Sequence, residues 1–127
     1  MNKEFIPYKQ AVALKKLGFD EPCFGCYDEK TIFGLTVMSI KQYYTNSKED
    51  TWNCAAPLYQ QAFRWFREKY GLGHMINGIG YESFIMNIGG MLHIFNAFDF
   101  KTYEEAELAC LNKLIEIVTN EQTRTTG

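Results

Sequence analysis

The sequence contains no apolar run near the roughly 20 residues that a helix needs to cross a bilayer. Its first ten residues, MNKEFIPYKQ, lack the apolar block of a secretory signal peptide. The formal net charge is only −2, which argues against general attraction to nucleic acid or to an anionic membrane. We therefore expect a cytoplasmic protein whose four cysteines are reduced thiols.

Two further absences limit the chemistry. The glycine-rich segment GLGHMINGIG, residues 71–80, is not followed by the Gly-Lys-Ser/Thr of a phosphate loop. It also lacks the strand–glycine–helix context of a dinucleotide site, so we interpret it as a loop that leads into a hairpin. The chain has only two histidines, His74 and His93, and no spacing selects either of them, with a cysteine and Asp99, as a catalytic set. We expect no catalytic residue and no cofactor.

Aromatic residues, in contrast, are abundant. They make up 16% of the 127 residues, with ten Phe, eight Tyr and two Trp. The length fits one domain, and each aromatic side chain buries a large area. Either these residues build the core, or they exceed what one small core can hide, in which case the surplus would form a pocket or a subunit interface.

Helical spacing of apolar residues predicts three helices. The first covers residues 7–17, with Gly18 as a left-handed cap and Phe19 folding back on Leu14. The second opens at Pro57 and ends at Gly71, with an apolar stripe of Tyr59, Ala62, Phe63, Phe66 and Tyr70. The third begins at Thr102, where TYEE forms a capping box with Glu105.

Two pairs of strands are predicted between these helices. The segments CFGCYD and TIFGLTVMSIKQYY are rich in strand-forming residues and predict two strands joined by a turn near residues 28–30. YESFIMNIGGMLHIFNAF predicts a hairpin with a Gly89-Gly90 turn, Ile85 opposite Ile94, and two largely apolar faces. One face would carry Tyr81, Ile85, Leu92, Ile94 and Phe98, and the other Phe84, Met86, Ile88, Met91, His93, Phe95 and Ala97. A helix, a partner subunit or a ligand should cover the second face.

The predicted order is α-β-β-α-β-β-α. It indicates an α+β fold in which three helices pack on an antiparallel sheet of about four strands. We expect residues 1–118 to form a single domain and the polar residues 119–127 to form a flexible C-terminal tail.

The Cys-x-x-Cys pair, Cys23 and Cys26, is the most conspicuous short motif. A structural zinc site needs four ligands, usually in two pairs, and no second pair is close in sequence. A redox pair normally lies at a helix N-terminus, whereas this one lies in a predicted strand. We interpret the two thiols as structural, and a metal site at Cys23 and Cys26 is the weaker alternative.

The second helix offers the best candidate for ligand binding. Arg64 and Arg67 lie beside Trp65 and Tyr59, and arginine forks bind phosphate while aromatic rings stack on bases. A solvated helix flank above core aromatics is the simpler interpretation. His93, in the middle of a strand, is either a core histidine or a further ligand contact.

Three blocks of the chain resemble a known family. They are EFIPYKQAVALKKLGFDEPCFGCYD, APLYQQAFRWFREKYGL and TYEEAELACLNKLIEI, about half of the sequence. Together they resemble a family of small uncharacterised bacteriophage proteins, also found in gut and marine Bacteroidetes-type sequences. The resemblance implies a phage or prophage protein that acts inside a bacterial cell and binds a host protein, a nucleotide signal or another copy. In that family the position of Cys26 is commonly aromatic, which further weakens the metal interpretation.

The favoured hypothesis is therefore a non-enzymatic binding module that forms a homo-oligomer through the second face of the hairpin. The first alternative is a phosphate-ligand or nucleotide-signal binding protein that uses Tyr59, Arg64, Trp65, Arg67 and His93. The second alternative is a small metalloprotein or enzyme that uses Cys23, Cys26 and a histidine.

Overall fold

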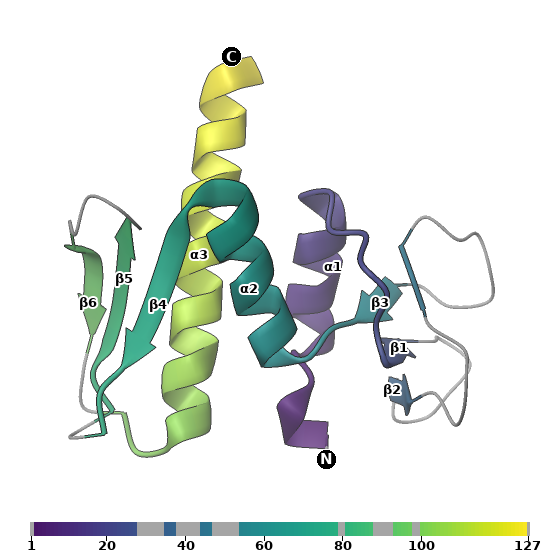
Figure 1. The fold of residues 1–127 in the computed structure, drawn as a ribbon, viewed down its shortest axis with the longest axis horizontal. Coiled ribbons are helices and arrows are strands. Elements are labelled where there is room, and N and C mark those ends of the chain that lie inside the picture. The colour runs from purple at the N-terminus through teal and green to yellow at the C-terminus, as the bar shows by residue number, and fades with distance from the viewer. Residues whose placement is uncertain are drawn as a thin grey trace. The chain divides into compact units, whose positions relative to one another are not determined.

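The computed structural model describes residues 2–27, 35–37, 44–46, 54–78, 81–87, 93–97 and 100–126 (Figure 1). These residues confirm the α+β class and the three predicted helices. They divide into two compact units, Met1–Tyr59 and Gln60–Gly127. The boundary falls at the first residue of helix α2 (Tyr59–Tyr70). The single domain expected for residues 1–118 stays a prediction.

Unit 1 contains a single turn of 3-10 helix, one α-helix and a small antiparallel sheet. The sheet has the order β2-β1-β3, and both pairs are antiparallel. The elements are η1 (Asn2–Glu4), α1 (Tyr8–Lys16), β1 (Gly25–Tyr27), β2 (Leu35–Val37) and β3 (Cys54–Ala56). The pairing of β1 with β2 confirms the first predicted strand pair, whose predicted turn lies outside the described residues. Strand β3 was not expected, because three residues ending before Pro57 give little sequence signal.

Helix α1 ends as its sequence predicts. Gly18 has a φ of +98°, which glycine adopts without steric cost. The N–H of Phe19 donates to the carbonyl of Leu14 at 3.0 Å, and the N–H of Gly18 donates to that of Lys15 at 3.1 Å. These are the two bonds of a Schellman motif. Phe19 and Leu14 are both buried, so the helix end also anchors the core of unit 1.

Polar bridges hold the segments of unit 1 together. The Tyr27 hydroxyl donates to the carbonyl of Ile6 at 2.6 Å, and the N–H of Ile6 donates to the carbonyl of Pro57 at 3.0 Å. Asn46 joins two further segments, because its Nδ2 donates to Phe19 O at 2.7 Å and its Oδ1 accepts from Ala55 N at 2.8 Å. Each bond satisfies a backbone group that water cannot reach easily.

Unit 2 contains most of helix α2, a second antiparallel sheet and a long helix. The sheet has the order β4-β5-β6, so the structure holds two three-stranded sheets in place of one sheet of about four strands. The elements that follow α2 are β4 (Leu72–Ile76), β5 (Ser83–Asn87), β6 (His93–Ala97) and α3 (Tyr103–Thr126). Figure 1 shows α2 and α3 on the same side of this sheet.

We predicted that residues 71–80 form a loop. This prediction is wrong, because Leu72–Ile76 form strand β4. Helix α2 begins at Tyr59 rather than Pro57, because the Pro57 carbonyl accepts from Ile6 and Leu58 forms a bridge to Phe5. The helix ends at Gly71, whose φ is +66°. The chain then pairs with β5 from Leu72 onward. The glycines of this segment obscured its alternating pattern.

Strands β5 and β6 pair as a hairpin, but the predicted register holds over only part of it. Met86 pairs with His93, as a two-residue turn at Gly89-Gly90 requires, and that turn lies outside the described residues. A bulge follows, so Ile85 pairs with Phe95 and not with Ile94. An extra residue on one strand shifts all later pairs by one, and sequence pattern alone does not reveal it.

Helix α3 begins with the predicted cap and extends past its predicted end. The Glu105 N–H donates to Thr102 Oγ1 at 3.1 Å, and Glu105 Oε2 accepts from the N–H of Lys101 rather than that of Thr102. The helix continues to Thr126, so residues 119–126 are helical where we expected a tail. No glycine or proline interrupts them, and Gln122 Nε2 donates to the Tyr70 hydroxyl at 3.3 Å. Among the described residues no helix is long and apolar enough to cross a membrane.

Candidate interaction surface

The register of β4 with β5 separates the two faces of the unit 2 sheet. Residues that pair across an antiparallel ladder lie on the same face. His74 pairs with Ile85 and Ile76 pairs with Ser83, so these residues belong to one face. The opposite face carries the pairs Gly73–Met86 and Met75–Phe84.

Helices α2 and α3 cover the first face. Ser83 and Ile85 are fully buried, and the Ser83 hydroxyl donates to the carbonyl of Ala106 in α3 at 3.3 Å. Phe63 of α2 stacks on the His74 ring. The apolar residues of α3 that line its buried side include Cys110, Leu111, Leu114 and Val118. This face is the core of unit 2.

The second face, which we call the open face, consists of Met75, Phe84 and Met86. Met75 is 48% exposed, and Phe84 and Met86 are half-buried. The contact of α2 with His74 and the contact of α3 with Ser83 both lie on the first face. The register also places His93 opposite Met86, as predicted, whereas Phe95 and Ala97 are opposite Ile85 and Ser83. The bulge therefore changes the pairing partners of Phe95 and Ala97 from those of the predicted register.

His74 is the most electrostatically perturbed residue of unit 2. Burial, together with the positive charge of Arg67, lowers the pKa of its imidazole to about 4. Its Nδ1 is buried and has no hydrogen-bond partner among the described residues. The ring is therefore neutral at pH 7, and it packs as an aromatic core residue rather than as a base in a cleft.

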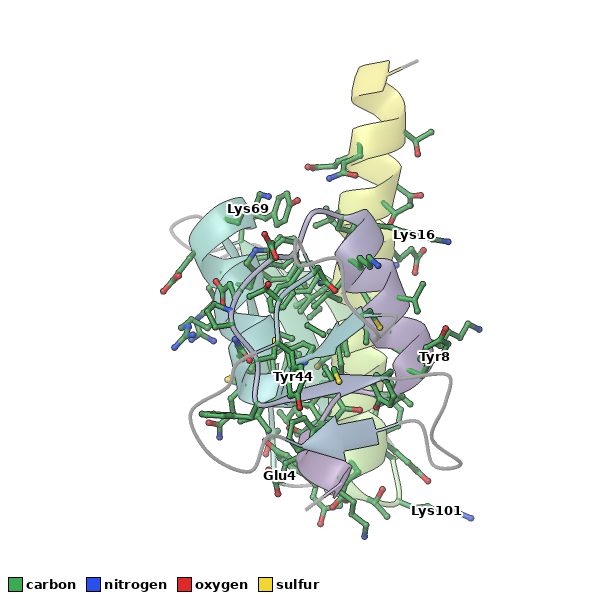
Figure 2. All side chains as sticks on the ribbon, turned by 90° about the vertical axis from the view of Figure 1, so that its right-hand side faces the viewer. Glu4, Tyr8, Lys16, Tyr44, Lys69 and Lys101 are labelled. Carbon is green, nitrogen blue, oxygen red and sulfur yellow. The ribbon has the colours of Figure 1, made fainter. Side chains whose placement is uncertain are left out.

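The predicted phosphate-binding residues lie on α2, except for His93 on β6. Arg64 and Arg67 are exposed, whereas Tyr59 and Trp65 are buried. The Trp65 ring contacts Phe66 and Tyr70 edge-on, and Lys69 Nζ lies 5.2 Å from its centroid. Figure 2 labels Lys69 on α2. A ring with these neighbours offers no free surface for a base, which argues against a stacking role. The phosphate site stays a prediction.

The cysteines of the Cys-x-x-Cys motif are core residues of unit 1. Cys23 and Cys26 are buried, and Cys23 Sγ donates to the Glu21 carbonyl at 3.3 Å. Cys54 pairs with Tyr27, the neighbour of Cys26, so Cys26 and Cys54 lie on opposite faces of the sheet. Among the described residues no group of three potential ligands is close enough to hold a metal ion.

The same thiols are poorly suited to act as nucleophiles. Burial raises the pKa of Cys23 to about 12, with further contributions from Glu21, Asp20 and Cys54. Burial also raises the pKa of Cys54 to about 11. The thiolate is the reactive form, so neither group ionises appreciably near neutral pH.

Comparison with known proteins does not extend this description, because no family model, no curated protein and no solved structure matches the chain.

Proposed function

We propose that this protein is a non-enzymatic binding module that acts through the open face of its unit 2 sheet. The observation that carries the proposal is the exposure of Met75, which lies with Phe84 and Met86 on the face opposite to the one that contacts α2 and α3. An apolar sheet face of this kind is stabilised when another surface removes it from water. Methionine side chains suit such contacts, since they are flexible and polarizable.

The partner that we propose for this face is a second copy of the chain, packed face to face. The low net charge of −2 offers little electrostatic barrier to association. The chemistry of the remaining candidates supports binding rather than catalysis, because the described thiols are buried and the partly buried imidazole of His74 is neutral at pH 7. The resemblance to small phage proteins supports the same proposal, with the bacterial cytoplasm as its place of action.

Sedimentation velocity over a wide concentration range tests the proposal. We expect the wild-type protein to associate, and Met86→Lys to weaken that association by placing a charge on the open face. Asn120→Lys is the matched control, because Asn120 is exposed on α3. A wild-type protein that stays monomeric and does not bind an apolar dye would refute the proposal.

A further inference from the structure

Strand β4 has an outer edge that no described strand occupies. It is the end strand of the β4-β5-β6 sheet. The N–H of Asn77 donates to the carbonyl of Glu82 at 2.7 Å, in continuation of the β4–β5 ladder. Because bonded and non-bonded pairs alternate in an antiparallel ladder, Gly73 and Met75 direct their backbone groups toward β5.

The alternate residues, Leu72, His74 and Ile76, therefore direct their N–H and carbonyl groups away from the sheet. Within the described parts of the chain, these outward groups have no hydrogen-bond partner. An edge of this kind is a template for another strand.

Strand β4 also lacks the devices that keep sheet edges apart. Its sequence, LGHMI, contains no lysine, no carboxylate and no proline, and its pairing with β5 has no bulge. The opposite edge strand, β6, carries the bulge described above. Bulges disfavour pairing with a further strand, so of the two edges β4 is the better suited to a partner strand.

We infer that a second copy of the chain pairs antiparallel with β4 about a two-fold axis at His74. In this register Leu72 is opposite Ile76 of the second copy, and His74 is opposite its counterpart. Each outward N–H of one β4 strand then faces an outward carbonyl of the other, which gives about six backbone hydrogen bonds. The exposed Met75 is opposite Gly73, which has no side chain to compete for the space. The edge is thus complementary to itself, as an isologous two-fold contact requires.

This edge contact is separate from the proposed packing of open faces, and it joins two open faces into one continuous surface. It is therefore tested in the Met86→Lys protein, in which the charge on the open face weakens face-to-face packing, at a protein concentration where that packing alone gives no dimer. We expect Met86→Lys to remain a dimer in sedimentation velocity, and Met86→Lys with Ile76→Pro to be a monomer. Proline at 76 removes only an outward N–H, which an edge strand tolerates. The double variant with Met86→Lys and Met75→Lys should also be a monomer. It leaves the backbone unchanged, and so it replaces the proline variant if that protein does not fold.

The register is tested by labelling Met75→Cys with pyrene in the same Met86→Lys background. The native cysteines are buried, so the label goes to position 75. Two labels on paired β4 strands lie close enough for excimer emission, whereas a label at Asn120→Cys gives none. A monomeric Met86→Lys protein overturns the edge contact but leaves the face-to-face proposal standing if the wild type associates. A dimer without excimer emission at position 75 also overturns it.

Discussion

The imidazole of His74 lies flat against the ring of Phe63, with 3.6 Å between the ring centroids and 16° between the planes. The contact joins β4 to α2, and it favours an uncharged imidazole because the ring is partly buried and its Nδ1 is fully buried. His74 therefore couples the packing of unit 2 to pH.

Acidification should weaken unit 2 through this histidine. The folded-state pKa of about 4 is below the ordinary value of 6.5, so the unfolded chain binds the proton first. The free energy of unfolding should therefore fall as the pH drops from about 6.5 to about 4, by at most about 3 kcal/mol. His74→Phe keeps an aromatic ring and has no proton to bind. Urea unfolding of both proteins between pH 7 and 4 measures the difference, and equal losses in the two would contradict the prediction.

Asn46 should be important for the stability of unit 1. Asn46→Ala removes the partners of the Ala55 N–H and the Phe19 carbonyl, and we expect a loss of about 2 kcal/mol in the free energy of unfolding. Asn46→Asp keeps the acceptor for Ala55 but not the donor to Phe19. Asn120→Ala, on the exposed side of α3, is the control and should change stability by less than about 0.5 kcal/mol. Equal effects at positions 46 and 120 in chemical denaturation would show that the bridge contributes nothing.

The start of α3 should depend on the Thr102 hydroxyl. Thr102→Ala removes the acceptor for the Glu105 N–H and should cost about 1 kcal/mol, whereas Thr102→Ser keeps a hydroxyl and should cost much less. Thermal unfolding followed by circular dichroism compares the two variants. The capping role is wrong if alanine and serine have the same effect.

The native cysteines should react slowly with Ellman's reagent. All four thiols are buried, and burial raises the pKa of Cys23, Cys54 and Cys110. We expect little reaction in the folded protein at pH 8 and four reactive thiols after denaturation. Met75→Cys adds one exposed thiol as a positive control for rapid reaction. Rapid modification of the folded wild type would show that a described cysteine is accessible.

Much of the candidate surface follows from the sequence. The surplus of apolar residues on YESFIMNIGGMLHIFNAF predicted a two-sided hairpin, and the pairing of Met86 with His93 has the predicted register. The neighbouring edge was not foreseen, because β4 was interpreted as a loop. The alternation of Leu72, His74 and Ile76 with Gly73 and Met75 is a strand pattern that Gly73 weakens.

The helix ends at Gly18, Gly71 and Thr102 were determined by the sequence alone, because a cap depends on residues within one turn of itself. The tertiary structure decided which strands pair, where the bulge lies and which sheet face the helices leave open. It also decided that His74 stacks on Phe63 and that α3 continues to Thr126. These features depend on contacts between residues far apart in the chain. A local sequence pattern does not show how strong such contacts are.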